Sequence, residues 1–225
     1  MMLKPTNYII DFDSTIIRCE SLDELARIAL RNKADHEDTM ITLERLTIDA
    51  MDGKIAFDEA LRQRLALFQA TREHVNELTQ FLHGQITTSL KNDMTWFNAN
   101  SDRIYVVSGG FEDYIKPVVA LLGIAPERVF ANRFTYDDAG DVTGYDHTSL
   151  LSRQGGKVDQ VVSMKLSGPV IMIGDGYTDY EVKAHKAADE FWAFTENVHR
   201  GRVTENADRI IETFPTVAPK LVLVS

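Results

Sequence analysis

The chain has 225 residues and a mass of 25.4 kDa, which suggests one large domain or one domain with a smaller insertion. Its composition, 44% hydrophobic and 26% charged, argues against extended disorder. The net charge of −10 disfavours binding to nucleic acid or an anionic membrane, and one cysteine, Cys19, excludes an intrachain disulfide. Because no segment has the ~20 apolar residues of a membrane helix and no signal peptide is evident, we expect a cytoplasmic protein.

Four short apolar runs, each followed by polar or glycine residues, predict parallel strands that are buried on both faces. The runs are Tyr8–Ile10, Ile104–Val107, Val170–Ile173 and Phe191–Phe194. Helical spacing fills the intervals, as in the helix expected from Phe111 to Leu122, with a kink at Pro117 and Gly123 at its end. This alternation predicts a doubly wound parallel α/β sheet, in which ligands bind beyond the carboxyl ends of the strands.

The stretch between the first strand and Ile104 breaks the alternation, because it predicts helices throughout. Ser21–Glu24 has the pattern of a capping box that begins a helix ending near Arg31. Three more helices are expected. The first runs from Glu37 to Asp52, and the second carries on one face Phe57, Leu61, Arg64 and Phe68. The third carries on one face Val75, Leu78, Phe81 and Leu82. We therefore expect a small helical cap domain at residues 18–85, inserted into a catalytic α/β core of residues 1–17 and 86–225.

Two further segments lie outside this alternation. Residues 129–147 predict a β-hairpin that turns at Asp138–Gly140. Residues 215–225 carry no pattern that places them in the fold.

Acidic side chains follow two of the predicted strands. Asp11 and Asp13 come directly after the first strand, and Asp175 and Asp179 follow the strand that ends at Ile173. If both strands are central, these carboxylates converge, and two like charges about 4 Å apart repel by roughly 4 kcal/mol at an effective dielectric constant of about 20. We therefore expect a cation there, and oxygen ligands beside a phosphate favour Mg²⁺ over zinc. Any one Asp alone is better explained as a cap of the following segment.

Two other features indicate an anion site. Ser108–Gly110 lies between a strand and the start of a helix, where backbone N–H groups and the hydroxyl can face an anion. Lys157, at the start of the next predicted helix, is unfavourably placed unless an anion lies nearby. Neither feature is specific alone, because glycine turns and solvated lysines are common.

Taken in order, Asp11–Thr15, Ser108–Gly110, Lys157 and Gly174–Asp179 resemble the four motifs of the haloacid dehalogenase superfamily of phosphohydrolases. The similarity is greatest to the members that act on O-phosphoserine, and it covers about residues 8 to 214. It includes positions of the expected cap, namely Glu20, Met51–Lys54, Phe57 and Arg64. The resemblance implies an Mg²⁺-dependent phosphatase that releases L-serine and phosphate in serine synthesis.

The resemblance also implies a role for each acidic residue. Asp11 is implied to be the nucleophile that forms an aspartyl-phosphate. Asp13 is implied to protonate the leaving oxygen and then to deprotonate the attacking water. Mg²⁺ is implied to bind Asp11, Asp175 and the backbone carbonyl of Asp13, with Asp179 ordering these ligands.

The phosphate oxygens are implied to be held by Ser108, the Gly109 amide and Lys157. Thr178 stands where many relatives have Asn, and its hydroxyl still donates a hydrogen bond to the substrate. Tyr177 is bulkier than the small residue usual in the family, which changes the rim of the site.

Substrate choice is expected to depend on the cap. Arg64 interrupts an otherwise apolar helical face, so its guanidinium can bind a carboxylate, while Glu20 can face an ammonium group. Such a pair above a phosphate site recognises an amino acid; alternatively, Arg64 extends to water and Glu20 merely precedes a helix. Met51 and Phe57 are expected to shield the site from water, although core packing explains them equally well.

Three functions remain open at this point. The first is the hydrolysis of O-phosphoserine, and the second is a phosphatase or phosphotransferase acting on another small phosphomonoester. The third is a non-enzymatic phospho-accepting switch, whose modules are shorter and lack a helical cap. The chain is expected to be a monomer or a homodimer.

Overall fold

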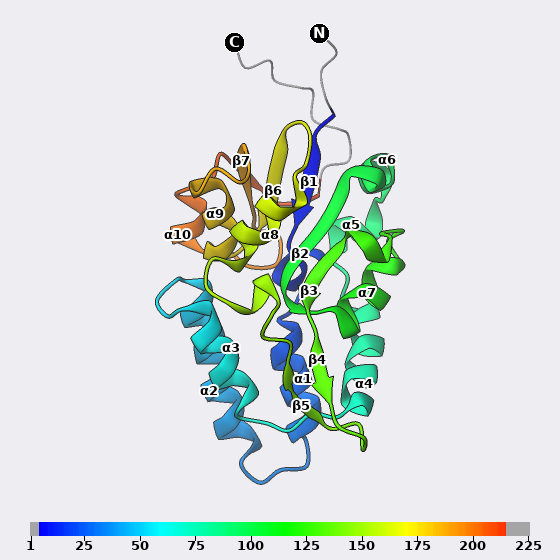
Figure 1. Ribbon diagram of the computed structural model, residues 1–225, viewed down its shortest axis with the longest axis vertical. Helices are drawn as coiled ribbons and strands as arrows, with labels where there is room; N and C mark the ends of the chain where they lie inside the picture. Colours follow the sequence, from blue (N-terminus) through cyan, green and yellow to red (C-terminus); the bar gives the residue numbers. More distant parts are fainter. Residues whose placement is uncertain (1–4, 215–225) are drawn as a thin grey trace.

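The computed structural model describes residues 5–214, and its centre is a parallel sheet in the order β3-β2-β1-β6-β7-β8. The strands are β1 (Asn7–Ile10), β2 (Ile104–Phe111), β3 (Val129–Asn132), β6 (Val170–Gly174), β7 (Glu190–Phe194) and β8 (Arg209–Ile211). β1 is central, because Ile10 pairs with Val106 of β2 on one side and with Ile173 of β6 on the other. The predicted doubly wound sheet is confirmed, and the carboxyl ends of β1 and β6 lie side by side (Figure 1).

Helices cover both faces of the sheet. They are α5 (Thr88–Asn92), α6 (Thr95–Asn100), α7 (Glu112–Ala120), α8 (Gly156–Met164), α9 (Tyr177–Ala184) and α10 (Gly201–Thr204). Short helical turns occupy Phe12–Ile16, Ser101–Arg103, Pro126–Arg128 and Leu150–Ser152. Because successive strand residues face opposite sides, Ile9 belongs to the apolar cluster of α8 and α9, whereas Tyr8 and Ile10 belong to the cluster of α6 and α7.

Four helices lie beyond the carboxyl ends of the strands (Figure 1). They are α1 (Ser21–Leu30), α2 (His36–Met51), α3 (Phe57–Leu65) and α4 (Arg72–His83). The hairpin of β4 (Phe134–Tyr136) and β5 (Val142–Tyr145) lies in the same region. The chain enters and leaves this helical part through adjacent segments, since Ile17 pairs with Ile86 and the Arg18 N–H donates to the Gln85 carbonyl at 2.9 Å. No helix within residues 5–214 is long and apolar enough to cross a membrane.

The start of α1 differs from the capping box expected at Ser21–Glu24. Glu20 is the N-cap residue and makes no side-chain cap, because its carboxylate accepts the Ser14 hydroxyl at 2.7 Å. The Ser21 N–H donates instead to Asp13 Oδ1 at 2.7 Å, and the Ser21 hydroxyl donates to the Tyr114 hydroxyl at 2.8 Å. The prediction of a capping box was wrong, because the carboxylate of Asp13 in the preceding loop caps the helix.

Other expectations need correction. The hairpin predicted over residues 129–147 is shorter, because β3 joins the main sheet beside β2 and only β4 and β5 form the hairpin. Phe68 lies beyond the end of α3, and Phe81 of α4 is 42% exposed. β8 was not predicted, and residues 215–225 lie outside the described residues.

The aromatic cluster under β1 and β7 provides a test of the core. Phe97 is fully buried and packs edge-on against Trp96 and Phe214. We expect Phe97→Ala to lower the free energy of unfolding by about 3–5 kcal/mol in urea denaturation, because it removes a buried ring and leaves a cavity. Phe81→Ala is the matched control and should cost less than about 1 kcal/mol. Equal costs for the two variants would contradict this packing.

Candidate active site

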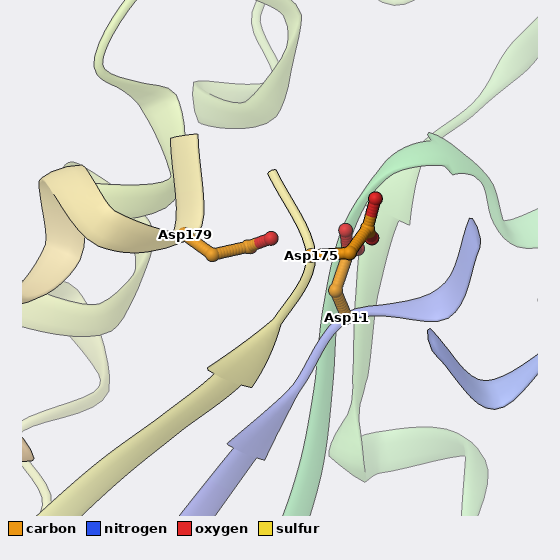
Figure 2. Close-up of side chains that lie close together, drawn as sticks. All are labelled: Asp11, Asp175 and Asp179. Atoms are coloured by element: carbon orange, nitrogen blue, oxygen red, sulfur yellow. The ribbon is translucent and has the colours of Figure 1, made fainter. Parts of the chain in front are cut away.

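Three carboxylates meet where β1 and β6 end. Asp11 follows β1, Asp175 follows β6 and Asp179 lies in the first turn of α9, and one oxygen from each lies within 4.8 Å of the others. Figure 2 shows the Asp179 carboxylate directed toward the other two. All three side chains are buried. A compact set of carboxylate oxygens is the donor set that Mg²⁺ prefers, so these residues fit the predicted metal.

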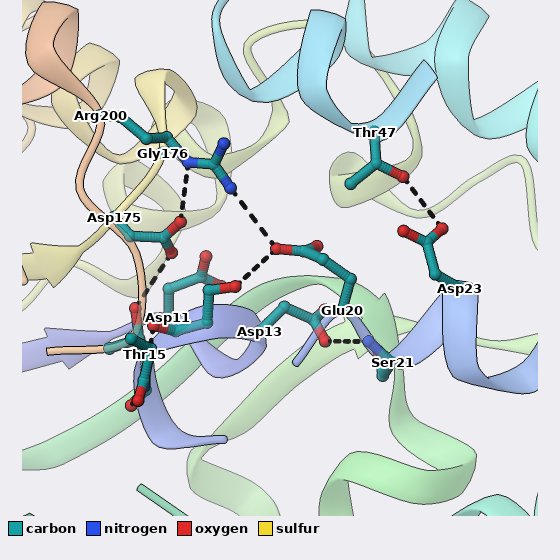
Figure 3. Close-up of polar contacts among 12 residues, drawn as sticks. Asp11, Asp13, Thr15, Glu20, Ser21, Asp23, Thr47, Asp175, Gly176 and Arg200 are labelled. Atoms are coloured by element: carbon teal, nitrogen blue, oxygen red, sulfur yellow. Dashed lines mark hydrogen bonds and ion pairs between the residues drawn. The ribbon is translucent and has the colours of Figure 1, made fainter. Parts of the chain in front are cut away.

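Two cations balance part of this negative charge. Lys157 Nζ lies 2.8 Å from Asp11 Oδ2 and 2.6 Å from Asp179 Oδ1. Burial acts against the Lys157 charge, yet Asp11 and Asp179 outweigh it and raise the lysine pKa. On the other side of the cluster, Arg200 Nε lies 3.1 Å from Asp175 Oδ2 (Figure 3). Lys157 lies at the start of α8, as predicted.

The cluster still has an excess of negative charge. Burial, with the neighbouring Glu20 carboxylate next, raises the pKa of Asp175 to about 8. Burial and the Asp11 carboxylate raise the pKa of Asp179 to about 7, against the opposing effect of Lys157. The site therefore binds protons near neutral pH unless a cation takes their place.

Asp13 has different surroundings from Asp11. The backbone leaves the helical region at Asp13 and adopts a left-handed conformation at Ser14, where φ is 52°. This turn directs the Asp13 carboxylate toward the start of α1, where it accepts the Ser21 N–H (Figure 3). Burial, with the Glu20 charge next, raises the Asp13 pKa well above its ordinary value. A buried carboxyl group that retains its proton can act as a general acid.

A cavity of about 30 Å³ opens between the strand ends and the helices beyond them. It is lined by most of the predicted site residues, namely Asp11, Asp13, Glu20, Met51, Phe57, Arg64, Ser108, Gly109, Lys157 and Thr178. Asp175 and Asp179 are not part of this lining, although one oxygen of each lies within 4.8 Å of one from Asp11. The structure therefore brings residues of the helical insertion and of the sheet to one small cavity.

The segment Ser108–Gly110 differs in one respect from the expected loop. β2 continues through it to Phe111, and its register against β3 shifts between Val107 and Phe111. The Ser108 hydroxyl accepts the Gly110 N–H at 3.0 Å. A Cβ at position 109 would lie 2.5 Å from the Phe57 ring. Gly109 thus allows Phe57 to close over the strand end.

Arg64 and Glu20 face this cavity from the insertion. Arg64 is buried, and its Nη2 lies 2.8 Å from Asp23 Oδ1 in α1, so it does not extend to water. Its buried Nε has no hydrogen-bond partner among the described residues. Glu20 Oε1 accepts the Ser14 hydroxyl and lies 3.6 Å from Arg200 Nη2. One free donor of a buried guanidinium is suited to an incoming anion.

The sequence analysis assigned no role to several residues that hold the site together. Arg200 bridges Asp175 and Glu20, and the Thr15 hydroxyl donates to Asp175 Oδ1 at 3.2 Å (Figure 3). The Asn197 amide donates to the Thr87 hydroxyl at 2.7 Å and to the Ser14 carbonyl at 3.1 Å. Arg200 and Asn197 follow β7, so their position beyond a strand end was the available indication. Asp23, the partner of Arg64, had no such indication.

Comparisons with known proteins agree with this geometry. The model of the haloacid dehalogenase-like hydrolase family matches residues 9–182. Human phosphoserine phosphatase is 35% identical over 207 residues, which cover 91% of this chain and 88% of the human protein. The chloroplastic phosphoserine phosphatase of Arabidopsis thaliana is 34% identical over 214 residues, which cover 94% of this chain and 70% of that protein.

A solved structure described as a phospho-aspartyl intermediate analogue of phosphoserine phosphatase superposes with a TM-score of 0.70 at 26% identity, covering 93% of this chain and 95% of that one. The chain therefore belongs to the haloacid dehalogenase-like hydrolase family. Its relatives named here are phosphoserine phosphatases, so the resemblance inferred from the motifs is confirmed.

The raised pKa values predict a pH-dependent response to metal. Between about pH 4 and pH 8 the folded, metal-free protein holds protons on Asp175 and Asp179 that the unfolded chain releases, so stability falls as pH rises. Mg²⁺ replaces those protons, and we expect it to raise the melting temperature by about 4 °C or more at pH 8 and by clearly less at pH 5.

Differential scanning fluorimetry with and without EDTA measures this response. Asp175→Asn should abolish the Mg²⁺ effect, whereas Asp102→Asn, on a side chain that is 73% exposed, should retain it. An Mg²⁺ response of the same size in both variants, or one that is independent of pH, would contradict the metal assignment.

Proposed function

We propose that this chain is an Mg²⁺-dependent phosphoserine phosphatase that hydrolyses O-phosphoserine to L-serine and phosphate. The observation that carries the proposal is one cavity lined by Asp11, Lys157 and Arg64, whose buried Nε has no hydrogen-bond partner among the described residues. Asp11 and Lys157 supply a nucleophile and a cation for a phosphate, and Arg64 supplies a buried donor for a carboxylate at the other end.

The chemistry divides between the two aspartates after β1. Asp11 attacks phosphorus in line with the ester oxygen and forms an aspartyl-phosphate, an intermediate supported by the analogue reported for a related phosphoserine phosphatase. Asp13, whose pKa burial raises, gives a proton to the departing serine oxygen and then takes one from the water that cleaves the acyl phosphate.

The remaining groups hold charge in place. The equatorial phosphate oxygens bind to Lys157, the Ser108 hydroxyl and the Gly109 amide. Each of these donors stabilises the transition state by about 3 kcal/mol. Asp11, Asp175 and the Asp13 carbonyl would hold Mg²⁺, with Asp179 ordering these ligands. When bound, the ion neutralises the nucleophile and the phosphate so that they can approach.

Recognition of the amino acid falls to the helical insertion. Arg64 binds the substrate carboxylate through its free donor, and Glu20 receives the ammonium group. Met51, Phe57 and the Thr178 hydroxyl line the same cavity and complete its walls. Met51 and Phe57 exclude bulk water, which protects the intermediate and leaves room only for a small substrate.

The division into domains belongs to the same proposal. Residues 18–85 form the cap domain, and residues 1–17 with 86–225 form the catalytic core. The pairing of Ile17 with Ile86 supports this division, because the two connections between these parts lie side by side. The cytoplasmic location and the monomeric or homodimeric state remain predictions.

Phosphate release from a panel of small phosphomonoesters tests the activity. We expect O-phosphoserine to be among the best substrates, with turnover that requires Mg²⁺ and falls by at least about 10³-fold in Asp11→Asn, because the nucleophile is lost. Transfer of the phosphoryl group to an added alcohol instead of water would favour a phosphotransferase. Release of one phosphate per chain without turnover would favour a phospho-accepting switch.

Arg64→Lys tests the substrate assignment, because it keeps the charge beside buried Asp23 while removing the planar fork. We expect KM for O-phosphoserine to rise about tenfold or more. Phosphoethanolamine, which lacks the carboxylate, is the matched substrate, and its kcat/KM should change by less than about threefold. Equal losses for both substrates would mean that Arg64 supports only the fold.

A further inference from the structure

We propose that Tyr177 and Arg202 are positioning residues that latch the loop 52–56, between α2 and α3, over the active site. The proposal concerns closure of the site and rests on the proposed phosphatase activity. The latch comes from the core, since Tyr177 begins α9 and Arg202 lies in α10, whereas the loop belongs to the helical insertion.

Arg202 makes the polar part of the latch. Its Nη1 donates to the backbone carbonyl of Asp52 at 2.7 Å, and its guanidinium carbon lies 4.7 Å from the centre of the Tyr177 ring. One cation therefore binds the loop backbone and the aromatic ring beneath it. A hydrogen bond from a charged donor is stronger than a neutral one, and the ring adds a cation–π attraction.

Tyr177 makes the apolar part. Its ring lies so close to Gly53 that a Cβ at that position would be 2.8 Å from Tyr177 Cδ1. Gly53 also has a φ of 68°, which a residue with a side chain rarely adopts. Gly53 therefore allows both the turn after α2 and the close contact with the ring. The bulky side chain of Tyr177 provides the surface on which the loop rests.

The two ends of the loop connect the latch to the active site. Met51 precedes the loop and Phe57 follows it, and both line the cavity above Asp11. The Phe57 N–H donates to Gln154 Oε1 of the core at 2.8 Å. Fixing the loop on the core thus fixes Met51 and Phe57 over the nucleophile.

Packing around the loop is sparse, so the few contacts of the latch carry much of the closure. A hollow of about 200 Å³ lies between the loop and the core, lined by Gly53, Lys54, Ile55 and Tyr177 among others. The Lys54 side chain is 56% exposed and pairs with Asp49 and Asp52 of the insertion. Opening the loop therefore breaks the latch and the Gln154 contact, together with the packing of Phe57 on Gly109 and of Met51 on Gly176.

Cleavage after Lys54 by endoproteinase Lys-C measures opening independently of catalysis. We expect Arg202→Gln to accelerate this cut about tenfold, the effect of losing one hydrogen bond from a charged donor. Tyr177→Ala, which removes the ring beneath the loop and its cation–π contact, should accelerate it as well. In steady-state assays with O-phosphoserine, KM should rise by a similar factor while kcat stays within about twofold, because the reacting groups are untouched. Arg202→Lys, which keeps a donor, should restore most of the protection.

Arg128→Gln is the matched control, since Arg128 lies over the Tyr105 ring at 5.0 Å, on the segment that leads into β3 and away from the insertion. It should alter neither the Lys54 cut nor KM. Gly53→Ala, which changes only the loop, should reproduce the faster cut and guards against misfolding of a core variant. The latch is refuted if Tyr177→Ala, Arg202→Gln and Gly53→Ala are cut at Lys54 no faster than Arg128→Gln. Faster cutting in a chain that does not hydrolyse O-phosphoserine would support the latch and reject the proposed activity.

Discussion

The parallel pairing of β1 with β6 is the constraint on which the site depends. Ile10 lies beside Ile173, so the residues that follow these strands, Asp11 and Asp175, leave the sheet together. Carboxylates gathered in a buried place are costly to ionise, and burial, with the charges of Glu20 and then Asp11, raises the pKa of Asp175. The fold therefore concentrates negative charge at the ends of β1 and β6. Two cationic side chains and a divalent cation can neutralise it.

Lys157 and Arg200, the two cationic side chains, lie on opposite sides of the carboxylate cluster and contact different partners. Lys157 joins Asp11 to Asp179 at the end of the cavity where we propose that phosphate binds. Arg200 joins Asp175 to Glu20 toward the helical insertion, so the carboxylate cluster at the strand ends and the Glu20 carboxylate are linked through one guanidinium. A substrate that carries phosphate, carboxylate and ammonium groups suits this distribution, whereas a neutral one does not.

Much of this arrangement could be predicted from short patterns. Apolar runs identified β1, β2, β6 and β7, and the acidic or glycine-rich residues after them located the cavity, because a parallel sheet gathers its strand ends. Predictions failed where a distant segment decided the local structure. Asp13, and not a capping box, accepts the N–H at the start of α1. Residues 129–132 pair with β2 and therefore do not belong to the expected hairpin. The role of Arg200 was indicated only by its place after β7, and that of Asp23 depends on a pairing with Arg64 that no spacing in the sequence reveals.

Anomalous diffraction from crystals soaked in Mn²⁺ tests the central claim most directly. The account predicts a single strong peak within about 2.3 Å of oxygens from both Asp11 and Asp175, as expected for direct ligation of a small divalent ion. The same crystals of Asp175→Asn should lose the peak. A peak elsewhere, or one that persists in Asp175→Asn, would contradict the view that the ends of β1 and β6 form the metal centre.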